Sequence, residues 1–168
     1  YDMSEITLEG KTVTYNGNAQ EIVIRGTLPE GVTVSYEGNG KVNAGTYTVA
    51  AKFLGNENYN EIADMTATLV INKATYDMTG VTYVGTEVTY DGQAHSIEAE
   101  NLPEGVTASY EGNEKIEAGT YTVVVSFTGD ANNYELIPSQ EVTLVINKAT
   151  YDMSEITLEG KTVTYNGN

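Results

Sequence analysis

The 168-residue chain contains no cysteine and no tryptophan, only two phenylalanines and only three prolines. Because cysteine is missing, no disulfide and no thiolate-bound metal can hold the fold together, which excludes a disulfide-stapled small domain. No apolar run approaches the ~18 residues that a membrane-spanning helix needs, and no charged-then-apolar leader begins the chain. This segment is therefore not expected to insert into a membrane.

Positive charge is also scarce. Eight Lys and Arg residues stand against 24 Asp and Glu residues, the formal net charge is −16, and Arg25 is the only arginine. Binding to a phosphate backbone requires clustered basic side chains, so nucleic acid and anionic membrane surfaces are excluded as partners. A dispersed acidic surface instead keeps neighbouring molecules soluble and apart.

An internal repeat with a period of 75 residues dominates the sequence. One residue is lost near Arg25–Thr27 in the second copy, and one is gained near Asn132–Asn133. The agreement exceeds what shared architecture alone requires, so the chain is a tandem array. The shared landmarks are Tyr-Asp-Met at 1 and 76, Leu-Pro-Glu-Gly-Val-Thr at 28 and 102, Ala-Gly-Thr-Tyr-Thr-Val at 44 and 118, and Leu-Val-Ile-Asn-Lys-Ala-Thr at 69 and 144.

The repeat predicts two complete modules, residues 1–75 and 76–150, followed by a partial third repeat, residues 151–168. The third copy matches residues 1–18 letter for letter and is expected to supply N-terminal strands only. The chain starts without Met and stops inside a repeat, so we expect it to be a window onto a longer array.

The same repeat also allows a second choice of module boundaries. Residues 19–93 and 94–168 also give two complete modules and leave residues 1–18 as the extra segment. The segment that ends at Ile71 has the character of a terminal strand, which favours the first division. In that division, the extra segment 151–168 either packs on the preceding module or pairs with another chain.

Apolar and polar residues alternate along several short segments of each module. Thr, Ser, Lys and Glu fill the opposite faces, and patterns typical of helices are nearly absent. This period of two predicts an all-β fold of antiparallel strands packed on one side, in two layers. The inward sets of the first module are Val32, Val34 and Tyr36; Tyr47, Val49, Ala51 and Phe53; Ala67, Leu69 and Ile71; and Ile22 and Ile24.

Turn residues separate these segments and point to a β-sandwich. Asn16-Gly17 and Asp91-Gly92 are typical of tight hairpins. We count roughly six or seven short strands per module, the spacing of an immunoglobulin-like sandwich. The alternative is a β-grasp-like module, which needs a helix for which the sequence offers no good candidate.

The link between modules contains no flexible Gly/Ser segment. Lys73-Ala74-Thr75 runs directly into Tyr76-Asp77-Met78, where Tyr76 and Met78 are apolar enough to pack. We predict a stiff junction and a rod rather than a loose string of modules.

The motifs resemble those of bacterial Ig-like surface repeats, in particular the MBG repeats (YGX and YDG types) of adhesins. The resemblance covers the whole chain and rests on four motifs. They are Ala-Gly-Thr-Tyr-Thr-Val, the Asn-Tyr loop, the closing Leu-Val-Ile strand and Val-Thr-Tyr-Asn/Asp-Gly. It implies an Ig-like sandwich in the ectodomain of a large cell-surface protein. It also implies that Tyr47 and Tyr121 lie near a tyrosine corner, with each hydroxyl bonded to nearby backbone.

Three functions remain open at this stage, all extracellular on a bacterial surface or secreted. The leading one is a structural stalk or spacer that projects a distal binding domain, with neighbouring repeats of the chain as its partners. The second is an adhesin module that binds host glycan or protein through its loops. The third is a subunit of a self-assembling fibre, in which a strand adds to the sheet edge of another copy.

No enzyme is expected. His95 is the only histidine and aligns with Gln20, so a catalytic role would not recur in both modules; we expect it to face solvent beside a turn. The acidic residues that do recur, such as Glu30 and Glu104, fall at turns or at the junction, which points to structure rather than to paired carboxylate catalysis.

Two kinds of binding site are weighed against ordinary structural roles. No cofactor is expected, and calcium is the one candidate ion, held by Asp77 with loop acids or by Asp130, although no Asp-x-Asp-x-Asp spacing exists. Most tyrosines fall on inward faces. Those that lie at junctions or in loops define a candidate contact surface and are Tyr1, Tyr59, Tyr76 and Tyr134.

Overall fold

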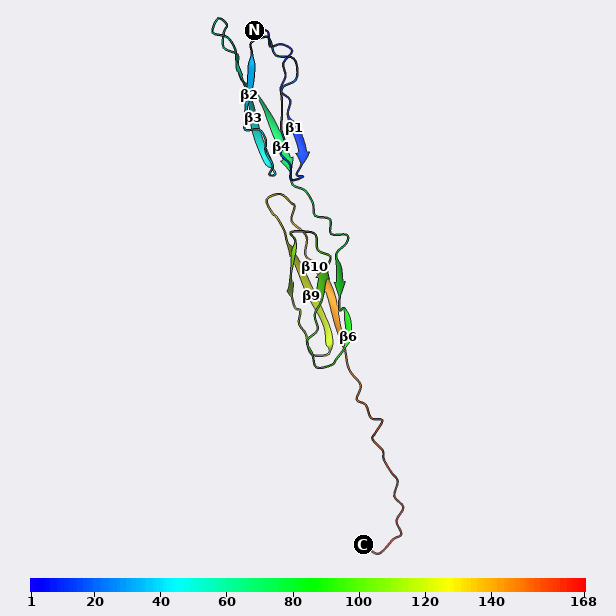
Figure 1. Ribbon diagram of the computed structural model, residues 1–168. Coiled ribbons are helices and arrows are strands. Elements are labelled where there is room, and N and C mark those ends of the chain that lie inside the picture. The colour runs from blue at the N-terminus through cyan, green and yellow to red at the C-terminus, as the bar shows by residue number, and fades with distance from the viewer.

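The computed structural model describes residues 1–168 and contains ten strands and no helix. Two elongated modules lie end to end, and the segment after the second module extends away from it to the C-terminus (Figure 1). The expected all-β fold of tandem sheet-based modules is confirmed. The β-grasp alternative is not supported, because the helix that it requires is missing.

Each module is built on one four-stranded sheet. In the first module the strand order is β1-β4-β3-β2, and in the second it is β6-β10-β9-β8. The strands of the first sheet are β1 (Lys11–Thr14), β2 (Thr33–Glu37), β3 (Gly45–Leu54) and β4 (Met65–Asn72). Those of the second are β6 (Glu87–Thr89), β8 (Thr107–Glu111), β9 (Gly119–Thr128) and β10 (Gln140–Asn147).

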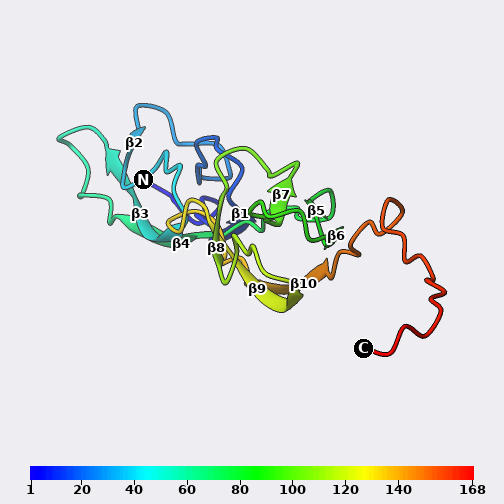
Figure 2. The ribbon, with the colours of Figure 1, turned by 90° about the horizontal axis from the view of Figure 1, so that it is seen from below.

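A smaller layer covers one face of each sheet. In the second module it contains a two-stranded ribbon of β5 (Thr82–Val84) and β7 (Glu98–Glu100), which lies across from β9 and β10 (Figure 2). In the first module the matching contact is a single bridge between Thr7 and Arg25. The two layers are therefore unequal, and the first module has four strands where more were predicted.

The core lies between these layers, as the alternating pattern requires. Val49, Ala51 and Leu69 are fully buried, and Ile22 closes the core from the covering layer. In the second module Ile97, Val123, Val125, Leu144 and Ile146 form the same cluster. Burying a side chain of this size stabilises the fold by about 1.5–3 kcal/mol. The inward sets on β3 and β4 are thus predicted correctly, and β9 and β10 bury the matching positions of the repeat.

The predicted hairpin at Asn16-Gly17 is wrong. Strand β1 pairs with β4 in parallel, with Lys11 opposite Leu69, so the sheet is mixed rather than purely antiparallel. After β1 the chain turns, with the Asn16 Oδ1 accepting from the Asn18 N–H at 2.9 Å, and crosses to the covering layer. The turn residues were recognised, but the partner of β1 lies far along the chain.

The segment around Ile22 and Ile24 is not a strand in the first module, although its alternation predicted one. Side chains satisfy its backbone instead. The amide of Asn39 accepts from Ile22 N–H at 2.9 Å and donates to Ile22 O at 2.7 Å, and Tyr36 Oη accepts from Ile24 N–H at 3.0 Å. Asn113 and Tyr110 repeat this clamp in the second module.

Residues 151–168 form no strand, although N-terminal strands were predicted there. In the first module the identical segment gains order because β1 pairs with β4 and Ile6 is buried in the module. Residues 151–168 have no β4 of their own module to pair with. Their large apolar side chains are exposed: Tyr151, Met153, Ile156, Leu158, Val163 and Tyr165.

Candidate functional site

The junction between the modules begins with a rigid loop on the first module. Tyr47 donates its hydroxyl to Asn43 O at 2.8 Å, four residues back, and an added Cβ at Gly45 would lie only 3.0 Å from that hydroxyl. Tyr121 makes the same bond to Glu117 O at 2.9 Å. Both hydroxyl-to-backbone bonds predicted from the Ig resemblance are confirmed, and they fix the loops just before β3 and β9.

The opposing side of the junction is the loop 129–135 of the second module. Asp130 shapes it by accepting from the Asn132 N–H at 3.0 Å, from the Tyr134 N–H at 2.9 Å and from the Asn133 side chain at 2.9 Å. The hydrogen bond from the Asn133 amide holds the pKa of Asp130 below its usual value. Asn133 is the one buried polar residue of the chain, at 7% exposure.

Side-chain hydrogen bonds cross from this loop to the first module. Asn133 Oδ1 accepts from the Ala44 N–H at 2.8 Å, and Asn133 Nδ2 lies 3.4 Å from Asn43 Oδ1. Lys73 Nζ donates to Ala131 O at 2.6 Å. A buried polar side chain with a partner for each amide atom is specific, because leaving either atom unpaired would cost about 1–3 kcal/mol.

The link between the modules is itself paired with the loop. Ala74 N–H donates to Asn133 O at 2.9 Å, and Glu135 N–H donates to Ala74 O at 2.8 Å. This parallel bridge joins Ala74 to Tyr134. The link is therefore an extension of the sheet structure and not a free tether. Its lack of Gly and Pro agrees with this, because strand-like pairing needs backbone N–H groups and restricted backbone freedom.

Tyr134 sits between two other tyrosines. Its ring stacks on Tyr76 at a centroid distance of 3.9 Å and meets Tyr15 edge-on at 5.6 Å. Tyr76 Oη accepts from the Asp130 N–H at 2.9 Å. An added Cβ at Gly129 would lie 2.5 Å from the Tyr76 ring, so the ring needs a glycine beneath it.

The same arrangement recurs at the free tip of the first module. Tyr1 stacks on Tyr59 at 4.1 Å, and Tyr1 Oη accepts from the Asn56 N–H at 2.9 Å. The structure thus places the four tyrosines singled out from the sequence in two stacked pairs. Tyr76 and Tyr134 lie at the junction, whereas Tyr1 and Tyr59 lie at the outer end.

The residues that connect the two modules most directly, Asn133, Asn43 and Lys73, were not singled out as a site from the sequence. One signal did point to Asn133, because the second copy of the repeat gains one residue near Asn132–Asn133. Nothing in the sequence indicated that this loop would meet residues about ninety positions earlier.

The other residues singled out from the sequence, Asp77 and His95, make hydrogen bonds or close contacts within local turns. Asp77 accepts from the backbone N–H and the hydroxyl of Thr79, and these bonds hold the pKa of Asp77 below its usual value. His95 Nε2 lies 2.8 Å from Asp91 Oδ1, and its side chain is only 21% exposed, so it is more covered than predicted. No group of three or more His, Cys, Asp or Glu residues is arranged to hold a metal ion.

These features define an all-β protein of tandem modules joined by a built junction. The MBG domain family matches residues 4–75 and again residues 79–150. The chain therefore belongs to the MBG domain family, as its motifs predicted.

Among solved structures, the chain is similar to the Bacteroides ovatus mixed-linkage glucan utilization locus SGBP-B, solved in complex with a mixed-linkage heptasaccharide. The identity is 12% and the TM-score 0.29, and the match covers 84% of this chain and 43% of that one. No curated protein matches the chain. The structure has no helix long and apolar enough to cross a membrane.

Proposed function

We propose that this chain is a stalk or spacer segment of a bacterial cell-surface adhesin, in which tandem MBG modules project a distal binding domain. The observation that carries the proposal is the junction centred on Asn133. A spacer that only tethered its domain would need no buried, fully paired side chain between modules.

The junction resists bending because its contacts must break together. The hydrogen bonds that Asn133, Lys73 and Ala74 make across the junction contribute about 0.5–1.5 kcal/mol each, and the Tyr15–Tyr134 ring contact adds about 0.5–1.5 kcal/mol. Tilting the modules would separate the loop 129–135 from the first module and would lose several of these contacts at once. The contacts therefore favour one inter-module angle over others.

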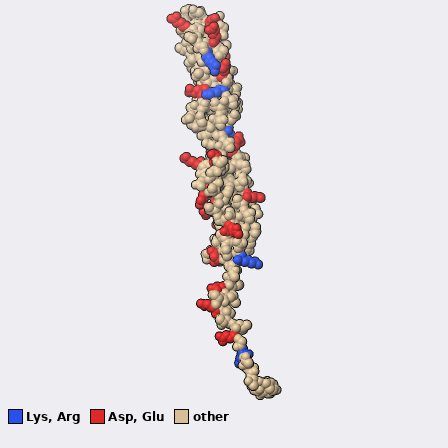
Figure 3. Space-filling model, turned by 90° about the vertical axis from the view of Figure 1, so that its right-hand side faces the viewer, with Lys and Arg blue, Asp and Glu red and all other residues tan.

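The charge distribution suits neighbouring stalks on one surface. Acidic side chains are spread along the visible face of both modules and the C-terminal segment, with few basic ones between them (Figure 3). With a formal net charge of −16, parallel copies repel one another and stay separate.

A surface-display experiment tests the proposal. The chain is placed between a wall anchor and a reporter binding domain, and a matched chain carries a flexible Gly/Ser linker of equal contour length. We expect a bulky ligand to reach the reporter more readily on the MBG stalk, because a flexible chain of the same length has a much shorter mean extension. Equal access with both linkers contradicts a spacer role.

A fibre subunit is the second candidate, favoured by one observation. Residues 151–168 carry exposed apolar side chains, including Leu158 and Tyr151, with no partner in this chain. The identical residues 1–18 pair with β4 in the first module, so the segment is suited to add to the sheet of another copy. If a chain ending at Thr150 assembles as well as the full chain does, strand donation is wrong.

Ligand binding through Tyr1 and Tyr59 is less well supported. Tyr59 is 56% exposed and borders a cavity of about 570 Å³ at the free tip, together with acidic residues such as Glu57 and Glu61. The counterpart of this pair, Tyr76 with Tyr134, is used for packing against another module. The shared arrangement favours contact with a module over contact with a glycan or host protein.

A further inference from the structure

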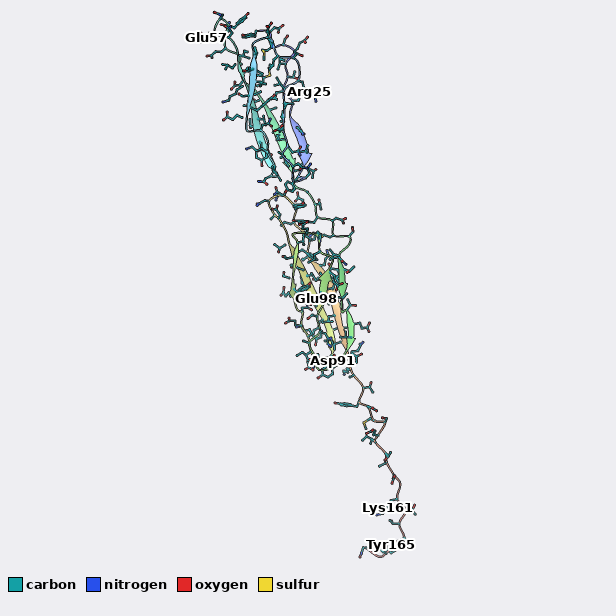
Figure 4. The ribbon with its side chains drawn as sticks, viewed as in Figure 1. Arg25, Glu57, Asp91, Glu98, Lys161 and Tyr165 are labelled. Carbon is teal, nitrogen blue, oxygen red and sulfur yellow. The ribbon has the colours of Figure 1, made fainter.

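A cavity of about 290 Å³ lies at the far end of the second module, beyond β10. Figure 4 shows this end near Asp91, at the opposite pole from Glu57 on the outer loop of the first module. We call the cavity the module 2 socket and define it by the residues that line it. They are Tyr90, Glu117, Ala118, Lys148, Ala149, Thr150 and Tyr151.

Each residue of the module 2 socket has a counterpart at the junction already described. The counterparts in the repeat are Tyr15, Asn43, Ala44, Lys73, Ala74, Thr75 and Tyr76. All of these except Thr75 contact the loop 129–135 through a hydrogen bond or a ring contact. The module 2 socket therefore matches the half of the described junction that receives the loop 129–135.

We propose that the module 2 socket binds the Asn-Tyr loop of the MBG module that residues 151–168 begin. The inference rests on the proposed stalk function, because it extends the same junction to the next module. Residues 151–168 repeat residues 1–18, so the occupant is the loop that corresponds to residues 55–60 of the first module.

The aromatic contacts of this loop are already visible in the first module. Tyr59 stacks on Tyr1 there, and Tyr151 is the repeat of Tyr1. Tyr151 is 90% exposed and Tyr90 is 39% exposed, so both rings are free to receive a tyrosine between them. The repeat of Tyr59 would then lie between Tyr151 and Tyr90, as Tyr134 lies between Tyr76 and Tyr15.

The polar contacts also have partners. Asn58 precedes Tyr59 as Asn133 precedes Tyr134, and its Nδ2 donates to Asn56 Oδ1 at 2.9 Å, as Asn133 donates to Asp130. The repeat of Asn58 can therefore accept from the Ala118 N–H as Asn133 accepts from Ala44.

Charges differ between the two junctions in a way that suits this occupant. The loop of the first module has Glu57 where the second has Ala131, and it is Ala131 O that receives Lys73. In the module 2 socket the repeat of Lys73 is Lys148, whose ammonium group would reach the backbone carbonyl of a glutamate residue and lie within the field of that residue's carboxylate. The attraction between these opposite charges adds to the hydrogen bond with the carbonyl.

Distance measurements between spin labels test the proposal. Because the chain has no cysteine, each introduced cysteine is a unique labelling site. The chain is extended after Asn168 with a further copy of residues 19–75, which completes the third module. One labelled pair, Thr48→Cys with Thr122→Cys, spans the described junction, and Thr122→Cys with the third module's copy of Thr48→Cys spans the proposed one. Both threonines are exposed on strands.

The proposal predicts a single narrow distance distribution for each pair. Tyr90→Ala should broaden only the distribution across the module 2 socket, and its matched control Tyr15→Ala should broaden only the other. A narrow distribution across the described junction with a broad one across the module 2 socket contradicts the socket proposal and leaves the stalk proposal standing. Broad distributions for both pairs overturn the stalk proposal as well. A Tyr90→Ala variant that leaves the second distribution narrow also contradicts the socket.

Discussion

The side-chain oxygen of Asn133 accepts a 2.8 Å hydrogen bond from the backbone N–H of Ala44, 89 positions earlier in the chain. The two residues belong to different modules, and the bond is largely shielded from water because Asn133 is only 7% exposed. One side chain thus ties a loop of the second module to the start of β3 in the first.

Asn133→Ala should uncouple the modules without unfolding either one. The change leaves the Ala44 N–H without its acceptor, at a cost of about 1–3 kcal/mol. Hydrogen exchange at Ala44 should therefore become faster, while amides in the centres of β3 and β9 keep their protection. Asn58→Ala, at the outer tip, is the matched control and should leave exchange at Ala44 unchanged. Unaltered exchange at Ala44 in Asn133→Ala contradicts the tie.

Tyr134 should act through its ring and not through its hydroxyl. Its ring contacts Tyr76 and Tyr15, and no hydrogen bond uses its hydroxyl. We expect Tyr134→Phe to preserve the coupled thermal unfolding of the two modules. Tyr134→Ala should separate it into two transitions, because it removes the Tyr15–Tyr134 contact, the ring pair that crosses between the modules and that contributes about 0.5–1.5 kcal/mol. Calorimetry distinguishes these outcomes, and a single unchanged transition in Tyr134→Ala counts against the account.

The Asn39 clamp should stabilise its own module. Asn39→Ala removes both partners of the Ile22 backbone, which costs about 1–3 kcal/mol for each group left unpaired. Chemical denaturation should show a lower free energy of unfolding for the first module, and Asn113→Ala should do the same for the second. Asn60→Ala, an exposed loop change, serves as the control. Equal stability of Asn39→Ala and Asn60→Ala would show that the clamp contributes nothing.

Acid should loosen the junction through Asp130. The Asn133 amide holds the pKa of Asp130 below its usual value, so the folded state favours the ionised carboxylate. Its contribution is fully present above the ordinary Asp pKa of about 3.9 and is lost as the pH falls through the lower pKa of the folded protein. The nearby Lys73 ammonium also lowers the pKa of Asp130, as a smaller contribution.

Exchange at Ala44 monitored from pH 6 to pH 2, after correction for the intrinsic pH dependence of exchange, checks this prediction. Asp130→Asn removes the titrating group and should flatten the corrected profile in the acid range. Other carboxylates with lowered pKa values, such as Asp77 and Asp2, remain in that variant and control for general acid effects. The same acid profile in the wild type and in Asp130→Asn excludes Asp130 as its cause.

The alternating pattern predicted the buried faces of the long strands, because local periodicity alone decides which side of a strand faces the core. Val49 and Ala51 on β3 are examples. It did not predict that β1 would lie parallel to β4, since pairing between distant segments leaves no local mark. The Asn16-Gly17 turn was recognised for the same local reason, and its hairpin was wrong for the same non-local one.

The junction likewise has local features that the sequence predicted and long-range contacts that it did not. The hydroxyl contact of Tyr47 spans four residues and could be carried over from the family motif. The stiff link was predicted from the absence of Gly and Pro, but its pairing partner in the loop 129–135 was not. Asn133 itself stands beside another Asn in an ordinary loop sequence. Only the meeting of the two modules shows why that residue is buried.

Spin labels at Thr48→Cys and Thr122→Cys in the 168-residue chain measure whether the junction holds the two modules in one fixed arrangement. The residues occupy matching positions on β3 and β9, so the distance depends on how the two modules are held together. A stiff junction predicts one narrow distribution that broadens in Asn133→Ala and Tyr134→Ala. A broad distribution in the unaltered background would contradict it, because the modules would then move independently despite the junction.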